Sequence, residues 1–524
     1  MAQQYNMLQI GGEDYTVHFE DRKDVKWTYI PFNSIADLEA LEQQTEEAEA
    51  FDFVFVFVFV FVQTPYSETL MRAFRLVSTP YNTYVDEHYW NGAFEAEPIV
   101  RERLIRPFRY ESKADCLTRL RSLAFIKQYG DRIHPKQCEV NPAFEGDVYY
   151  NGQHAIVLTG DFGETYTPIL NWKMYLYYDK DKVNTIWPEY TATGDVEISY
   201  TLRLYQEPTM KKLMCQYVLE GPSLQQPLEI PSMPHDAYIL ITAQAKGRGT
   251  LSVGNIHKRW SRLEYGHAIL GGQRYVDEDR GEFLHYFHPG DLKPPLNVYF
   301  SGYRTAEGFE GYFMMEKLNA PFLLFTDLRY EGGGFYLGSD AFESRIKTVI
   351  QETLDWLGFE DDALILSGLS MGSFGVLYYG AQLNPTAIVV GKPLVNMGSI
   401  AKNMRLMRPN DFGTAIDILR GNEGSIDDEA VTRLNQKFWS VLNGANIENT
   451  IFAVSYMEND DYDIQAFSDL LPVLSRQGAR VMSRSIPGRH NDDTPTIASW
   501  FNHFYYMIME SEFGRVKHER KASI

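Results

Sequence analysis

The segment Gly368-Leu369-Ser370-Met371-Gly372 has the residue types and spacing of a nucleophile elbow, G-x-S-x-G. In this motif a serine occupies a tight turn between a strand and a helix, and glycines are needed because side chains would clash there. Apolar residues 363–366 predict the strand, and small residues 373–380 predict the helix. The pattern therefore predicts that Ser370 is a nucleophile for acyl chemistry. The alternative is a glycine-rich turn with a capping serine.

A nucleophilic serine needs a general base, and three histidines follow Ser370, namely His490, His503 and His518. His503 falls within the predicted last helix, and His518 falls within a charged tail. His490 lies in the loop 487–492, between the last predicted strand and the last predicted helix. An imidazole must reach the serine from such a loop above the sheet. We therefore expect His490 to be the base, against the alternative of a loop histidine without a role.

The acid that orients the imidazole should lie between the serine and the histidine in the chain. Residues 457–463, which follow a predicted strand at 450–456, contain four carboxylates. We favour Asp460 because it is placed like the aspartate in the usual G-x-x-D-x-x turn of this fold. Glu458 and Asp461 remain alternatives.

The oxyanion of the tetrahedral intermediate needs two backbone N–H donors. We expect one from Met371, directly after the nucleophile, and the other from Tyr303, in the loop after the predicted strand 296–301.

The elements that must position these residues define the fold class. The chain has 524 residues, which suggests about three units at the usual ~150 residues each. Residues 265–524 alternate strand and helix, with strands also expected at 322–327, 364–367, 387–390 and 480–486 and helices at 341–357 and 494–510. This pattern predicts a mostly parallel sheet and, with the elbow, a C-terminal α/β-hydrolase-like catalytic domain.

The first half differs in character. Residues 146–264 contain alternating or β-branched segments, such as 197–205, 238–243 and 250–253, which predict a β-sandwich. Residues 1–145 are expected to form an N-terminal α/β domain with strands at 7–10 and 27–30 and a helix at 35–48. The run 53–62 alternates Phe and Val, which predicts a strand buried on both faces.

Composition narrows the function classes. The net charge of −21 argues against nucleic acid as a partner. Three cysteines without a C-x-x-C pair do not form a disulfide framework and fit a reducing compartment. We expect no integral membrane segment, because the run 53–62 is too short to cross a bilayer as a helix. We also expect no metal and no cofactor, since His285 and His288 have no third ligand in view.

The chain resembles the family of accessory secretory protein Asp-two, of the accessory Sec system in Gram-positive bacteria. The resemblance covers nearly the full length. It rests on the α/β and β-sandwich first half, on the stretch 259–262 (Arg-Trp-Ser-Arg) that leads into the hydrolase-like domain, and on the elbow with its downstream acid and His490.

The resemblance implies a cytoplasmic protein, peripheral at the membrane translocon, that forms a hetero-oligomer with two other accessory secretory proteins and the accessory Sec motor ATPase. It also implies O-acetylation of N-acetylglucosamine on a serine-rich repeat glycoprotein adhesin before export, with Ser370, Asp460 and His490 as the triad. Candidates for binding such a sugar are aromatic or planar polar side chains: Trp260, Tyr303, Arg304, Arg329 and Tyr330. Two other functions stay open: a carbohydrate or carboxyl esterase that uses water, and a non-catalytic export chaperone on a hydrolase scaffold.

Overall fold

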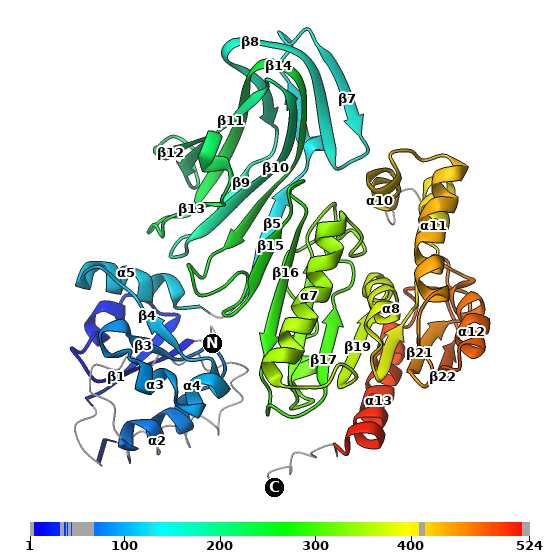
Figure 1. Ribbon diagram of the computed structural model, residues 1–524. Helices are drawn as coiled ribbons and strands as arrows, with labels where there is room; N and C mark the ends of the chain where they lie inside the picture. The colour runs from blue at the N-terminus through cyan, green and yellow to red at the C-terminus, as the bar shows by residue number, and fades with distance from the viewer. Residues whose placement is uncertain are drawn as a thin grey trace.

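The protein has a mixed α/β architecture with several sheets (Figure 1). The computed structural model describes residues 5–31, 36–37, 39, 43, 68–125, 127–407 and 414–515. The predicted strand 53–62 and most of the predicted helix 35–48 lie outside these residues. Among the described helices, none combines the length and the apolar character needed to cross a membrane.

The N-terminal part contains two small parallel sheets surrounded by helices. The predicted strands at 7–10 and 27–30 are confirmed as β1 (Tyr5–Ile10) and β2 (Val25–Ile30), which pair in parallel. The second sheet joins β3 (Tyr84–Asp86) to β4 (Arg106–Phe108). The helices are α2 (Glu68–Val77), α3 (Gly92–Glu95), α4 (Pro98–Arg103) and α5 (Lys113–Leu123).

The central part is an antiparallel sheet of ten strands that encloses its own apolar core. Its strands are β5 (Gly130–Ile133), β6 (Cys138–Val140), β7 (Asp147–Asn151), β8 (Ala155–Trp172), β9 (Leu176–Tyr178), β10 (Asn184–Gly194), β11 (Glu197–Gln206), β12 (Leu213–Glu220), β13 (Leu228–Ile230) and β14 (Ala237–Trp260). Strand β14 pairs with β10 and β11 along one edge and with β5, β8 and β9 along the other. Strands β5 and β6 precede residue 146, where the sequence places the start of this domain.

One prediction in this part is wrong. The sequence predicts separate strands at 238–243 and 250–253, whereas β14 runs unbroken through both. The glycines in this segment predict an interruption of the strand, because glycine in a strand interior usually weakens it. The strand instead stays paired with β8 through register shifts, one of them between Ala245 and Gly247.

The C-terminal part is an eight-stranded sheet in the order β15-β16-β18-β17-β19-β20-β21-β22. Strands β15 (Gln273–Val276) and β16 (Glu282–His288) are antiparallel to their neighbours. The other six pair in parallel and confirm the predicted strands: β17 (Leu296–Phe300), β18 (Phe322–Asp327), β19 (Leu364–Leu369), β20 (Ala387–Gly391), β21 (Ile451–Met457) and β22 (Arg480–Ile486).

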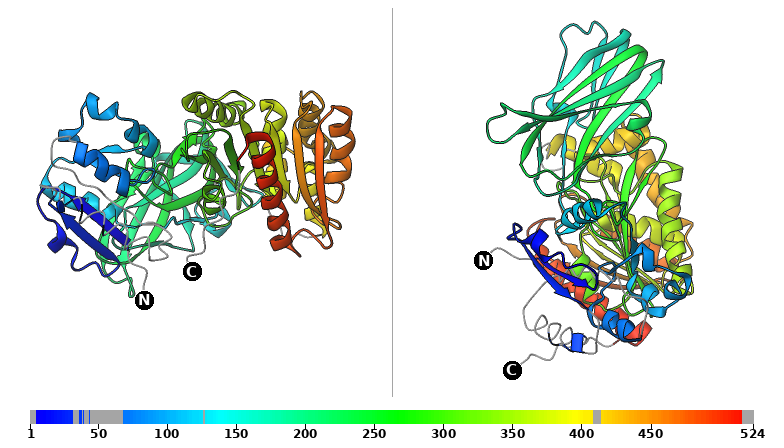
Figure 2. Two further views of the ribbon diagram at one scale, coloured as in Figure 1. Left: turned by 90° about the horizontal axis from the view of Figure 1, so that it is seen from below. Right: turned by 90° about the vertical axis from the view of Figure 1, so that its left-hand side faces the viewer.

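Helices cover both faces of this sheet. Successive residues of a strand point to opposite faces, so neighbouring residues of one strand join different cores. Val298 joins the core under α7 (Asp340–Leu357), α8 (Met371–Leu383), α9 (Met397–Met407), α10 (Thr414–Glu423), α11 (Asp428–Asn443) and α12 (Ala466–Arg476). Its neighbour Tyr299 joins the opposite core, formed with α6 (Tyr312–Glu316), α13 (Thr494–Phe513) and α5 of the N-terminal part. Figure 2 shows α13, in red, against one side of this sheet and the central sheet extending away from the helices.

Candidate active site

Ser370 lies at the turn between β19 and α8, in the strand–turn–helix setting that the sequence predicts. Its backbone has φ 52° and ψ −119°, a strained conformation for a residue with a side chain. Both flanking glycines are required by close backbone contacts. A Cβ on Gly372 would lie 2.1 Å from the Phe300 carbonyl oxygen, and one on Gly368 would lie 2.8 Å from the backbone of Gly372. Ser370 therefore stands at the turn itself, directly before the first residue of α8.

His490 reaches Ser370 from the loop between β22 and α13. Its Nε2 lies 2.8 Å from the serine Oγ. The imidazole is 1% exposed, and the ring of Tyr462 stacks on it with centroids 4.2 Å apart. The backbone N–H of His490 donates to Asp461 Oδ1 at 3.1 Å. Contacts on the ring and the backbone therefore hold the imidazole in one orientation.

The carboxylates after β21 have separate partners. Asp460 Oδ2 lies 2.8 Å from His490 Nδ1, and its Oδ1 accepts the backbone N–H of Tyr462. Asp461 holds the His490 backbone, as described above. Asp463 accepts the backbone N–H groups of Val395 and Asn396.

The fourth carboxylate of this segment, Glu458, is exposed. Among the four, Asp460 is thus the residue whose carboxylate meets the imidazole nitrogen. A buried carboxylate at this position favours the Nδ1–H tautomer and leaves Nε2 to accept the serine proton.

Two loops lie beside the elbow: residues 301–311, which follow β17, and residues 328–338, which follow β18. Met371 is the first residue of α8, so its N–H has no carbonyl one turn earlier in the helix. Gly302 lies beside the elbow, since a Cβ on it would be 3.2 Å from the Leu369 carbonyl oxygen. Tyr303 follows directly, with its ring over Gly332 of the second loop. The two predicted oxyanion residues thus both belong to segments that lie next to the elbow.

The predicted sugar-binding side chains do not gather here as a group. Arg329 is ion-paired with Asp327 at 2.7 Å and stacks over Phe342, which makes it structural. Trp260 lies at the end of β14, where its indole N–H donates to Asp179 at 2.7 Å. Tyr303 and Arg304 remain beside the elbow. Tyr330 packs edge-on against His154 of the central part.

Sequence reasoning missed Lys392, a buried lysine directly after β20. Its Nζ donates to Thr494 Oγ1 at 3.2 Å. Burial lowers the pKa of Lys392, although the Asp460 and Glu310 carboxylates act in the opposite direction. Nothing in the local sequence marks it, because its neighbours come from other loops.

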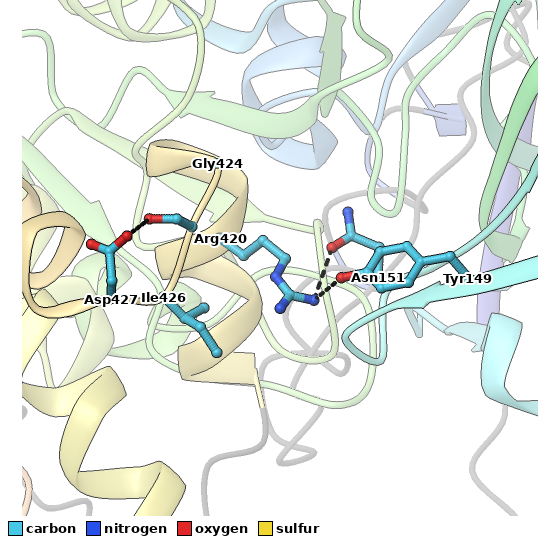
Figure 3. Close-up of a pocket in the computed structure, with 7 residues that line it drawn as sticks. Tyr149, Asn151, Arg420, Gly424, Ile426 and Asp427 are labelled. Carbon is cyan, nitrogen blue, oxygen red and sulfur yellow. Dashed lines mark hydrogen bonds between the residues drawn. The ribbon is translucent and has the colours of Figure 1, made fainter.

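An open cleft of about 560 Å³ lies away from these residues, between β7 and the connection from α10 to α11 (Figure 3). Arg420 spans it and donates to the Tyr149 hydroxyl at 2.6 Å and to Asn151 Oδ1 at 3.4 Å. None of its lining residues belongs to the Ser370 site. No group of three or more His, Cys, Asp or Glu residues in the described ranges could hold a metal ion.

Known proteins resemble the chain over its whole length. A family model described as "Accessory Sec system GspB-transporter" matches residues 5–515. An accessory Sec system protein Asp-two of Staphylococcus aureus is 52% identical over 529 residues, covering 100% of both chains. The protein of the same name from Streptococcus gordonii is 41% identical over 407 residues, 77% of this chain and 79% of that one.

One solved structure is similar in fold as well as in sequence. It is a chain of the Glycosylation Associate Protein (Gap123) complex from Streptococcus agalactiae, with a TM-score of 0.89 and 33% identity. The match covers 98% of this chain and 100% of that one. The arrangement of parts described above therefore recurs in a protein that was solved within a complex.

Proposed function

The chain belongs to the accessory Sec system family described as GspB-transporter, and from that premise we propose that it is a serine-dependent O-acyltransferase of the α/β-hydrolase type. It acetylates N-acetylglucosamine on a serine-rich repeat glycoprotein adhesin and supports export of that adhesin. The observation that carries the proposal is the continuous contact from Ser370 Oγ through His490 to Asp460, with both links at 2.8 Å.

The first half-reaction loads the enzyme. Ser370 Oγ attacks the carbonyl carbon of an activated acyl donor while His490 Nε2 takes the serine proton. Asp460 stabilises the imidazolium through Nδ1–H. The carbonyl oxygen becomes an oxyanion, which accepts from the N–H groups of Met371 and Tyr303. When the intermediate collapses, the C–O or C–S bond to the leaving group breaks, His490 returns the proton to that group, and an acyl-serine ester remains.

The second half-reaction uses the same residues in reverse. A sugar hydroxyl loses its proton to His490 Nε2 and attacks the acyl-serine carbonyl. Collapse of this intermediate breaks the bond to Ser370 Oγ, which regains the proton. If water enters in place of the sugar, the product is free acid. Stacking of Tyr462 on the buried imidazole supports transfer, because it limits the space open to water on that face.

The proposed partners are two other accessory secretory proteins and the accessory Sec motor ATPase. Support comes from the similarity to a chain solved in the Gap123 complex. The sequence of the first 260 residues shows no catalytic motif, which leaves this part of the chain available for such contacts. Size-exclusion chromatography with light scattering tests this part, and a monomer in the presence of every cognate accessory protein would contradict it.

The chemistry is tested with purified protein, an activated acetyl ester and a glycoprotein that carries N-acetylglucosamine. Mass spectrometry should find an adduct of one acetyl group on the peptide with Ser370 and acetylated sugar in the product. Ser370→Ala should give neither. Acetate with no acetylated sugar would support an esterase, and activity that survives Ser370→Ala would overturn the serine mechanism.

A further inference from the structure

A group of charged side chains is buried where the central sheet meets the C-terminal part. Its members come from β5, β10, β14, β15, β16 and one loop. Five of them are buried, Arg132, His257, Arg259, Glu282 and Glu307, and two are partly buried, Glu189 and Arg274. Arg259 pairs with both Glu282 and Glu307. Buried ion pairs are costly to desolvate and seldom add stability over apolar packing. A role in holding specific groups in place accounts for such a set better than stability does.

Glu307 connects this charged group to the loop after β17, residues 301–311. Its carboxylate accepts from Arg259 Nε and from His257 Nδ1, both on β14. His257 also meets Glu189 at 2.8 Å. Burial alone would raise the pKa of Glu307, but the positive charges of Arg259 and His257 lower it to about 2. The carboxylate is therefore charged, and its position depends on strand β14.

The backbone of the same loop is held from outside the C-terminal part. The N–H of Glu307 donates to the Gly130 carbonyl at 3.1 Å. The Gln128 side chain makes a two-way bond with the backbone of Phe309, at 2.8 and 2.7 Å. On the inner side, the Gly302 N–H donates to Glu310 Oε2 at 2.7 Å. The loop that carries Tyr303 is thus fixed between the elbow and the segment around β5.

Arg132, on β5, joins this loop to the second loop at the site. Its Nη1 donates to the carbonyls of Leu328 and Tyr330 at 2.7 and 2.6 Å. Its Nη2 donates to the carbonyls of Arg304 and Thr305 at 3.4 and 3.3 Å. One buried guanidinium therefore binds four carbonyls on the two loops beside Ser370.

We propose that Arg132 is a positioning residue that sets the Tyr303 N–H for the oxyanion, so that the central sheet takes part in catalysis without touching substrate. The inference rests on the proposed function. The evidence is two hydrogen bonds of the Arg304 backbone. The Arg304 carbonyl accepts from Arg132, and the Arg304 N–H donates to the Gly332 carbonyl at 3.2 Å. Without the guanidinium, the 304–305 peptide, two peptide units after the one that carries the Tyr303 N–H, loses a fixed anchor. In a variant without the guanidinium, the Tyr303 N–H has to be ordered during the reaction. In the wild type this donor is already in place.

The test compares Arg132→Met with Arg274→Met. Arg274 is a matched control because it belongs to the same charged group and pairs with Glu282, but makes no hydrogen bond to either loop. With p-nitrophenyl acetate, Arg132→Met should lower kcat by roughly 10- to 100-fold and change KM by less than about threefold, since an oxyanion donor acts in the transition state. Arg274→Met should keep most of kcat, and Arg132→Lys should recover part of the loss. A loss in KM, or one no larger than in Arg274→Met, would overturn the inference.

Hydrogen exchange of the backbone amides provides a readout that needs no turnover. Amides in 301–311 should exchange at least about tenfold faster in Arg132→Met than in the wild type, and should be unchanged in Arg274→Met. If the wild type shows no acyl chemistry at all, the proposed function fails, while faster exchange still supports the positioning role. Unchanged exchange in Arg132→Met overturns that role whatever the activity.

Discussion

The phenol ring of Tyr462 lies against the imidazole of His490, with centroids 4.2 Å apart and 24° between the planes. This contact covers a face of the proposed base. Tyr462 also supplies the N–H that binds Asp460 Oδ1 at 2.9 Å, so one residue orients two members of the proposed triad.

We predict that Tyr462→Ala lowers kcat for acetyl transfer by up to about tenfold, because a stacked aromatic pair contributes about 0.5–1.5 kcal/mol. Tyr462→Phe is the control, since it keeps the ring and loses only the hydroxyl that accepts from Asn491 at 3.3 Å. Steady-state kinetics check both variants. Equal losses in the two would show that the hydroxyl matters and the stacking does not.

Single substitutions of the acidic residues after β21 test which carboxylate is the acid of the proposed triad. Asp460→Asn should lower kcat by as much as ~10⁴-fold, because an amide favours the wrong tautomer of His490. Asp461→Asn should have a smaller effect, since Asp461 accepts the backbone N–H of His490, whereas Asp460 meets the imidazole nitrogen. Glu458→Gln, at an exposed position, should behave like the wild type. If Glu458→Gln or Asp461→Asn proves to be the crippled variant, the assignment of Asp460 is wrong.

The sequence was informative about this site wherever one segment carries the signal. Ser370 and its glycines stand together, and His490 is marked by its loop between the last strand and the last helix. For the acid, the sequence leaves three residues, because Glu458, Asp460 and Asp461 share one turn. Neighbouring residues in a turn can face quite different partners, so only the three-dimensional arrangement distinguishes the one that meets the imidazole.

The buried charged group could not be predicted in this way. His257 and Arg259 look like surface residues of a strand, and their partner Glu307 lies about 50 positions further along the chain. The correct strands of the C-terminal part follow from strong β-branched and apolar runs. The length of β14 does not, because pairing with β8 outweighs the local preference of its glycines to end a strand.

The two glycine contacts at the elbow predict a large loss of stability in Gly372→Ala. The new methyl group would meet the Phe300 carbonyl oxygen at 2.1 Å, and neither backbone can move without disturbing β17 or α8. We expect the free energy of unfolding to fall by about 3 kcal/mol, the upper end of the usual cost of overpacking. Gly444→Ala is the control, because its nearest contact would be an ordinary 3.4 Å. Urea unfolding measures both variants, and similar values for the two would contradict the predicted clash.

His257 predicts a specific dependence of stability on pH. Burial alone would lower its pKa, but the Glu307 and Glu189 carboxylates raise it to about 9, from an ordinary value of 6.5. The folded state therefore binds one proton more than the unfolded state between these values. This contribution to stability is complete below pH 6.5 and disappears as the pH rises through about 9, with a slope of at most about 1.4 kcal/mol per pH unit.

Denaturant unfolding of wild type and His257→Gln at several pH values checks this prediction. The wild type should lose stability relative to the variant as the pH rises from 6.5 to about 9. The variant removes the titrating group and keeps a side chain that can hydrogen-bond. Parallel curves for the two proteins over this range would show that folding does not raise the pKa of His257.

Ser370→Ala in cells tests whether acyl transfer and export can be separated. Alanine has no nucleophilic oxygen, so acetylation of the adhesin glycan should disappear. The fold should survive, and stability should be equal to or higher than that of the wild type, because the change removes a single oxygen at a strained position and creates no clash. The proposed partner surfaces lie mainly on the first 260 residues, away from the serine. The adhesin should therefore still be exported, at least in part, with an altered glycan.

Mass spectrometry of adhesin glycans and co-purification of the accessory proteins measure the two functions. Unchanged acetylation would contradict the enzymatic role, and loss of the whole complex would contradict the claim that the two roles are separable.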